Sequence, residues 1–156
     1  MAIAKRLKWY LDTHHVQYEL IHHAHTQTSL GAAKAAHVAG GKMVKCVLME
    51  DERGYVLAVV PASCQIVMRG IRDELGRELE LASEAELADV FSDCELGAIP
   101  PVGDAYGIPT VVDDSLLRLP DLYLEGGDHE ELVHVNGAAF RALFSEAAHG
   151  RFARPH

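Results

Sequence analysis

The chain has few cysteines, and none is placed like a disulfide partner or a zinc ligand. Cys46, Cys64 and Cys94 are an odd number at wide spacing, and no Cys-x-x-Cys pair occurs. This pattern indicates neither a disulfide framework nor a cysteine zinc site. Unpaired cysteines fit a reducing compartment, so the sequence predicts a cytoplasmic protein.

Long apolar runs are also lacking. The longest, Val56 to Ala62, is much shorter than the roughly 20 residues that a membrane-spanning helix needs. The first residues lead directly into an amphipathic helix and lack the apolar run of a signal peptide. We therefore expect no membrane partner.

Basic residues are in the minority. Fourteen lysines and arginines against 23 acidic residues give a net charge of −9. Broad binding to duplex nucleic acid needs a basic surface, so we expect no DNA partner. The early cluster of basic residues still allows one small end of a nucleic acid to dock locally; it comprises Lys5, Arg6, Lys8, Lys34, Lys42 and Lys45.

What the chain does have is enough apolar material for one core. Hydrophobic residues make up 49% of 156 residues, which fits a single domain of ordinary size. We predict one domain over residues 1–150, followed by a disordered tail over residues 151–156. Short helices and strands interleave, which indicates an α+β fold.

Periodicity and capping signals give the elements. The polar, glycine-ended turn at 50–54 predicts a central hairpin, and Ser83 with Glu86 forms a capping box. We expect helices at 2–13, 28–38, 64–75, 84–91 and 136–148. We expect strands at 16–21, 43–49, 55–60, 78–81, 110–112, 122–124 and 132–135.

The stretch from Leu96 to Gly103 fits neither a regular helix nor a central strand. Pro100 and Pro101 remove two backbone donors, yet the stretch is nearly all apolar. A rigid, apolar, irregular segment suits either an ordinary connector or the wall of a pocket. In the second case, the amides of Gly97, Ala98 and Ile99 could stabilise a developing oxyanion.

Lys45 stands directly before the apolar run 46–49. It could be a solvated residue at a strand end. It could also hold a phosphate, because lysine acts as a mobile point charge.

An ordered set of segments includes the glycine–proline stretch and Lys45 and gives a more specific indication of function. It comprises His25–Thr28 before an alanine-rich helix, the lysine strand 43–48, the hairpin strand 55–61, the Gly-x-x-x-Pro stretch Gly97–Pro101, the segment 111–116, and Gly126–His129. In this order they resemble the YbaK/prolyl-tRNA synthetase-associated editing domain family. The resemblance covers roughly residues 5–145. It implies a single α+β domain with an antiparallel-rich, barrel-like mixed sheet and flanking helices.

The resemblance also implies an activity. Members of the family hydrolyse the ester between a wrong amino acid and its tRNA, as separate proteins or as synthetase insertions. Carried over, Lys45 would hold a phosphate near the terminal adenosine, and the loop Gly97–Pro101 would hold the substrate carbonyl. The substrate's own ribose hydroxyl would help to activate water. Thr28, Cys46, Pro100 and Pro101 would line the substrate site.

Cys46 is a departure, because other members carry asparagine or threonine after the lysine. It would make the pocket more apolar. The partner implied is the acceptor end of a mischarged tRNA, with an aminoacyl-tRNA synthetase as a further candidate. We expect a monomer and no cofactor.

Two further residues have open roles. His129 could contact the ribose, shuttle a proton or orient water, or it could be a turn histidine facing solvent. Asp113 could orient the pocket as a carboxylate, although Asp113-Asp114-Ser115 suits helix capping very well.

Two other functions stay open. The acidic charge favours a non-catalytic module that binds a nucleotide or a synthetase. The ten histidines, with dense groups at 14–15 and 22–25, suggest a metal-dependent hydrolase as an alternative. However, the sequence has no HExxH pair, and no third ligand stands at a diagnostic spacing. We therefore expect no metal site.

Overall fold

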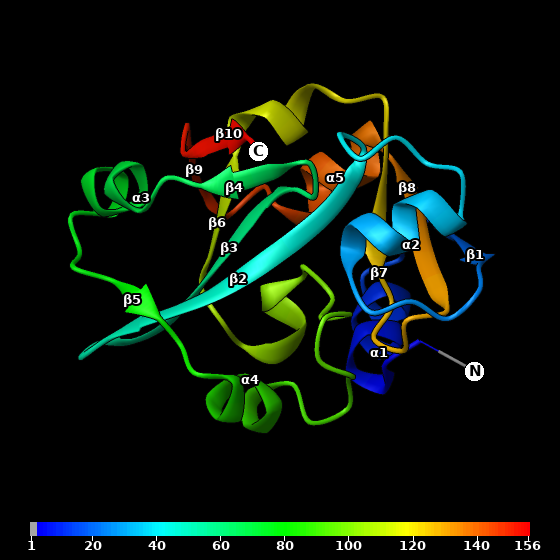
Figure 1. Cartoon of the computed structure of the whole chain (residues 1–156), viewed down its shortest axis with the longest axis horizontal. Helices are drawn as coiled ribbons and strands as arrows, with labels where there is room; N and C mark the ends of the chain where they lie inside the picture. The colour runs from blue at the N-terminus through cyan, green and yellow to red at the C-terminus, as the bar shows by residue number, and fades with distance from the viewer. Residues whose placement is uncertain (1–2) are drawn as a thin grey trace.

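The computed structural model describes residues 3–156 and shows a mixed sheet with helices around it (Figure 1). The sheet has eight strands in the order β1-β8-β7-β2-β3-β6-β9, with β5 paired to β2. Their bounds are β1 Glu19–His22, β2 Met43–Asp51, β3 Gly54–Pro61, β5 Glu80–Leu81, β6 Thr110–Asp113, β7 Asp121–Glu125, β8 Glu131–Asn136 and β9 Ala148–Gly150. The predicted single α+β domain with a mixed sheet is confirmed.

The predicted central hairpin is present as β2 and β3. These strands pair antiparallel from Val44 opposite Pro61 to Asp51 opposite Gly54 at the turn, with Lys45 opposite Val60. The outer neighbours β7 and β6 run parallel to the hairpin strands. Because both faces of the hairpin are covered, its sequence is almost continuously apolar rather than alternating.

The helices α2, α4 and α5 begin where capping residues predict. Thr28 accepts from the amide of Gly31, Ser83 and Glu86 form the reciprocal box, and Asn136 accepts from Ala139. The α-helices are α1 Lys5–Thr13, α2 Ser29–Ala35, α3 Met68–Leu75, α4 Glu84–Val90 and α5 Gly137–Leu143. Two 3₁₀ turns, η1 Gly103–Tyr106 and η2 Asp114–Arg118, flank β6.

The core lies on both faces of the sheet. On one face, α1 and α5 bury Leu7, Leu11 and Phe140. On the other, Ile71 of α3 packs in a cluster with Phe152. Each such side chain contributes roughly 1.5–3 kcal/mol by leaving water. None of the helices formed by residues 3–156 has the length and apolar character needed to cross a membrane.

The structure differs from the sequence prediction near residue 64 and at the chain's end. Cys64–Ile66 form strand β4 instead of a helical turn, and β4 pairs with β10, Ala153–Pro155. The expected helix 136–148 ends at Leu143, and its last expected residue begins β9. Residues 151–156, called the C-terminal segment below, are thus ordered against the fold and do not form the expected disordered tail.

The order of the C-terminal segment has a clear physical cause. Phe152 is 2% exposed, so the segment buries a large aromatic side chain. Its amide and that of Ala153 both donate to Oδ1 of Asp113, at 2.9 and 3.0 Å. Hydrophobic burial and satisfied backbone donors together offset the entropy of ordering these residues.

Candidate active site

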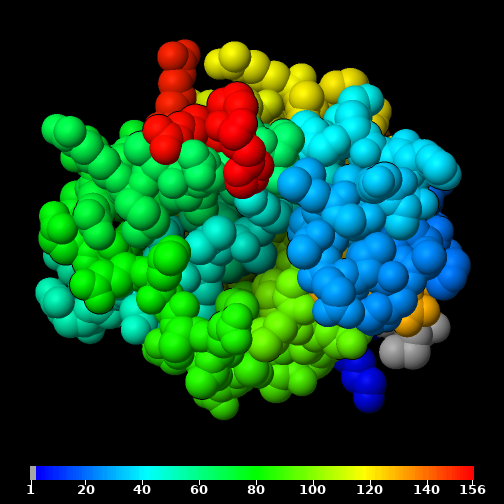
Figure 2. Space-filling view, in the orientation of Figure 1, coloured from blue at the N-terminus to red at the C-terminus, as the bar shows by residue number. Residues whose placement is uncertain are grey.

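A cavity of about 550 Å³ opens on one face of the molecule. Figure 2 shows it as a hollow bordered by the blue, green and red parts of the chain. Its walls come from the start of α2, from β2, β5 and α4, from the Leu96–Pro101 loop and from the C-terminal segment. The lining residues are Gln27, Thr28, Ser29, Leu30, Lys45, Cys46, Val47, Leu48, Ala62, Leu81, Ala82, Leu87, Gly97, Ile99 and His156.

The cavity exists because one edge of β2 is only partly paired. On that edge β2 pairs with β7 at Met43 and Val44, and with β5 at Met49 and Glu50. Between the two pairings, residues 45–47 have β3 on one side and the cavity on the other, and the carbonyl of Leu48 accepts from the amide of Ala82. The gap therefore places Lys45 in the cavity wall, on a central strand that is held rigidly by its hairpin partner.

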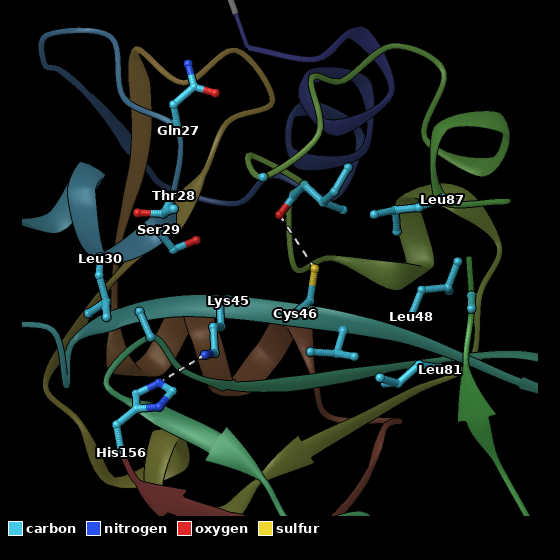
Figure 3. Close-up of a pocket in the computed structure, with 15 residues that line it drawn as sticks. Gln27, Thr28, Ser29, Leu30, Lys45, Cys46, Leu48, Leu81, Leu87 and His156 are labelled. Carbon is cyan, nitrogen blue, oxygen red and sulfur yellow. Dashed lines mark hydrogen bonds between the residues drawn. The ribbon is translucent and has the colours of Figure 1, made fainter. Parts of the chain in front are cut away.

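Lys45 brings a cation to this cavity. Its Nζ lies 3.5 Å from Nε2 of His156, and Figure 3 shows both side chains at the same end of the pocket. Burial lowers the pKa of the Lys45 ammonium from its ordinary value. An ammonium that has lost part of its hydration binds an anion more strongly than one in bulk water.

Gly97 forms the opposite wall. Its φ is +87°, and a Cβ there would overlap the carbonyl oxygen of Gln27 and come 3.0 Å from Cε1 of His129. Only glycine fits this conformation in this space. Gly97 therefore lets its loop pack against the Gln27–Leu30 segment, which forms the adjoining part of the cavity wall.

The three predicted amide donors are not equivalent. The amide of Ala98 donates to the carbonyl of Glu95 at 3.1 Å, and its side chain is fully buried. The Ala98 amide is thus occupied in a turn, which revises its predicted role. Gly97 and Ile99 line the cavity, and among residues 3–156 their amides have no hydrogen-bond acceptor.

Cys46 joins the loop to the sheet. Its thiol donates to the carbonyl of Ile99, with 3.6 Å between sulfur and oxygen. Burial raises the pKa of the Cys46 thiol, so the side chain stays protonated and can donate. The residue lines the cavity as a small, weakly polar group and also fixes the position of Ile99.

His129 lies behind the cavity wall and does not line it. It is 3% exposed, and its Nε2 lies 2.6 Å from the carbonyl oxygen of Leu96. Since a carbonyl only accepts, Nε2 carries the proton. The carbonyl of His129 in turn accepts from the amide of Thr26. His129 therefore supports both loops, which meet at Gly97 and Gln27 beside the cavity, and it is not the solvent-facing turn residue that one interpretation expected.

Asp113 is also outside the cavity. It caps η2 by accepting from the amide of Ser115 at 3.1 Å, as the capping interpretation predicts. Its other oxygen holds the amides of Phe152 and Ala153. Asp113 thus acts on the cavity only indirectly, by anchoring the segment that carries His156.

The structure therefore places half of the site residues predicted from the sequence in the cavity lining. Lining residues among them are Thr28, Lys45, Cys46, Gly97 and Ile99. Ala98, Pro100, Pro101, Asp113 and His129 lie behind the lining or away from it. Thr28 also caps α2 through its Oγ1, so its hydroxyl is shared with the amide of Gly31.

Two groups near Lys45 and α2 carry no sequence signal that could have revealed them. His156 comes from a polar chain end, and Glu125 reads as an ordinary strand residue. Glu125 ends β7 and is fully buried, and Ser29 Oγ, from the cavity wall, donates to its Oε2 at 3.2 Å. Burial raises the pKa of the Glu125 carboxyl to about 7.

The histidine groups do not assemble into a metal centre. His22 pairs with Glu131, while His25 lies near Glu95 and against the ring of His129. Within residues 3–156, no group of three or more histidine, cysteine or acidic side chains is arranged to hold a metal ion.

A comparison with known protein families identifies the family of this chain. The family described as the aminoacyl-tRNA editing domain matches residues 23–143, which is more than half of the chain. The chain belongs to this family. The matched region contains the β2 edge, the Leu96–Pro101 loop and α2, and so most of the cavity lining of the editing domain.

Solved structures agree with this assignment at the level of the fold. A crystal structure described as that of a candidate trans-editing enzyme for prolyl tRNA synthetase matches with a TM-score of 0.82 and 23% identity, covering 96% of each chain. The hypothetical protein APE2540 matches with a TM-score of 0.84 and 21% identity, over 96% of this chain and 100% of that one.

A larger protein contains the same fold. A candidate signal transduction protein from Marinobacter aquaeolei VT8 matches with a TM-score of 0.79 and 22% identity, over 95% of this chain and 30% of its own. None of the curated proteins compared with the chain matches it.

Proposed function

We propose that the protein is a trans-acting aminoacyl-tRNA deacylase, which hydrolyses the ester of mischarged tRNA. The observation that carries the proposal is a cavity that combines a cation, Lys45, with the amides of Gly97 and Ile99, which have no acceptor among residues 3–156. A phosphate and an ester carbonyl need these two kinds of partner. Membership of the editing domain family supports the same substrate class.

The two ends of the cavity suit two parts of an aminoacyl-adenosine. Lys45 and His156 form a polar end, while Leu48, Leu81 and Leu87 gather at the other (Figure 3). We assign the terminal phosphate to the polar end and the amino-acid side chain to the apolar end. The ester then lies between them, beside Gly97 and Ile99.

The chemistry needs little from the protein beyond positioning. Water attacks the ester carbonyl, and the amides of Gly97 and Ile99 stabilise the negative charge on its oxygen. The bond to the ribose oxygen then breaks, and that oxygen takes a proton as it leaves. Among residues 3–156 no carboxylate lines the cavity, so the adjacent ribose hydroxyl is assigned to orient the water. His129 is assigned to hold the loop.

The direct test is a panel of mischarged tRNAs incubated with catalytic amounts of protein. Multiple turnovers on at least one of them would support a deacylase. A stable complex without turnover would instead support the non-catalytic binding module, and no deacylation above the buffer rate on any member would refute the proposal.

Lys45→Ala tests the assigned phosphate contact. Removing the cation should lower kcat/KM by about 100-fold, because the phosphate loses its charged partner. Lys42→Ala is the matched control: Lys42 precedes the same strand, but its ammonium pairs with Asp121 at 3.5 Å, outside the cavity. It should stay within about twofold of the wild type. A folded Lys45→Ala protein with full activity would contradict the role given to Lys45.

A further inference from the structure

We propose that His156 is a second ligand of the phosphate that Lys45 binds, so that the anion site is a lysine–histidine pair completed by the C-terminal segment. The inference rests on the proposed function for the identity of the substrate. It adds a binding residue from outside the region matched by the family, which ends at residue 143.

The C-terminal segment is firmly attached to the fold, which a binding residue requires. Besides the two bonds to Asp113, the carbonyl of Phe152 accepts from Val67 at 2.6 Å. Residues 153–155 pair with β4, and the amide of His156 donates to the carbonyl of Ser63 at 3.3 Å. Figure 1 shows this segment, in red, beside β4. The backbone of His156 is thereby fixed at the rim of the cavity.

The spacing of the two side chains suits one phosphate. The 3.5 Å between Nζ of Lys45 and Nε2 of His156 exceeds by about 1 Å the roughly 2.5 Å between two oxygens of a phosphate, so each nitrogen can face its own oxygen at about 2.8 Å. An ammonium has donors only, so without an anion Nε2 accepts from Lys45. When a phosphate arrives, a change of tautomer gives Nε2 a hydrogen to donate.

The charge around the pair leaves this corner free for an anion. None of the ion pairs formed within residues 3–156 involves Lys45 or His156. Besides His156, the neighbouring group that contributes to the electrostatics of Lys45 is Cys64 on strand β4, and it is not an acid side chain. The chain has a net charge of −9, so a cation without an acidic partner, beside an imidazole, gives a locally positive place in an acidic protein. We assign the phosphate to this place.

The test compares two substrates that differ only in the phosphate. The amino acid removed fastest in the tRNA panel is placed on the 3′ oxygen of adenosine, with and without a 5′-phosphate. His156→Ala should raise KM about 5- to 10-fold for the phosphorylated ester, leave kcat within about twofold, and leave the other ester unchanged. His156→Arg should restore most of the loss, because it returns a donor.

Arg154→Ala is the matched control, since it removes a cation from the same segment that does not line the cavity. It should behave as the wild type does. Asp113→Asn should reproduce the KM effect of His156→Ala by loosening the segment, and the two changes together should not add up. An unchanged KM in His156→Ala, or an equal rise for both esters, would overturn the proposal.

A binding measurement separates this inference from the proposed function. Titration calorimetry with adenosine 5′-phosphate and with adenosine needs no turnover. His156→Ala should weaken binding of the nucleotide about 5- to 10-fold and leave adenosine binding unchanged, even if no tRNA is deacylated. Equal binding of the nucleotide by wild type and variant would refute the role of His156.

Discussion

At the scale of single residues, Gly97 is where backbone conformation and cavity shape depend on each other most directly. Its positive φ turns the loop, and its missing side chain leaves room for the carbonyl of Gln27 on the adjoining segment. The two amides proposed to hold the ester flank this turn. A change at Gly97 therefore acts on the site through geometry rather than through charge.

Gly97→Ala should consequently lose both activity and stability. We expect kcat/KM to fall about 100-fold, since the Cβ displaces the loop from the Gln27 segment. Gly107→Ala is the control, because Gly107 has φ +69° but an added Cβ there would meet no heavy atom within 4 Å. It should cost only the backbone strain, about 1 kcal/mol in denaturant unfolding, at full activity. A folded, fully active Gly97→Ala protein would show that the loop does not hold the ester.

Glu125 makes the stability of the fold depend on pH. Burial raises the pKa of its carboxyl from 4.5 to about 7, so the folded state binds this proton more tightly than the unfolded state. The free energy of unfolding should therefore fall as the pH rises from about 4.5 to about 7, by about 3 kcal/mol from this group. Glu125→Gln removes the titration and should flatten this part of the curve.

Urea unfolding at pH 5 and pH 8 measures the effect. The control is Glu78→Gln, whose side chain is 92% exposed and should leave the slope unchanged. The same decrease in Glu125→Gln as in the wild type would mean that the buried carboxyl is not the source.

At the scale of elements, the sequence predicts the helix starts and turns that depend on residues close by in the chain. The box of Ser83 and Glu86, the caps at Thr28 and Asn136, and the turn before Gly54 each lie within a few residues of the element they start or end. Lys45 and Gly97 are recognisable for a similar reason. A lone lysine beside an apolar run and a glycine beside two prolines stand out by residue type alone.

Elements that depend on distant partners are not predictable in this way. Cys64–Ile66 become a strand only because residues 153–155, about 90 positions later, pair with them. Phe152 is one aromatic residue in a polar chain end, and nothing nearby indicates that Asp113 accepts from its amide. The sequence does not single out His156 or Glu125, because their places near the cavity follow from these long-range pairings.

At the scale of the whole molecule, an acidic protein is proposed to bind a polyanion. The proposed anion site, at Lys45 and His156, is short, and the chain has a net negative charge. The protein should therefore hold the end of its substrate and make few contacts along the rest. Recognition would come from the shape of the cavity rather than from long-range attraction.

This arrangement predicts a shallow dependence of activity on salt. Each phosphate neutralised on a single strand contributes a slope of about −0.7, so one or two contacts give about −1 in log kcat/KM against log salt. Lys45→Ala should reduce the slope by about 0.7, and Lys42→Ala should not change it. Initial rates on a mischarged tRNA at several salt concentrations measure this, and a slope of about −5 or steeper would contradict it by indicating an extended basic surface.

The pairing of β10 with β4 also orders events during synthesis. A ribosome delivers the chain from its N-terminus, and a domain can begin to fold while its later part is still being made. The hairpin β2–β3 and the Gly97 loop are then available well before Phe152 and His156. A growing chain can form the sheet and the apolar end of the cavity, but the proposed anion site is completed only when the last described residues have emerged.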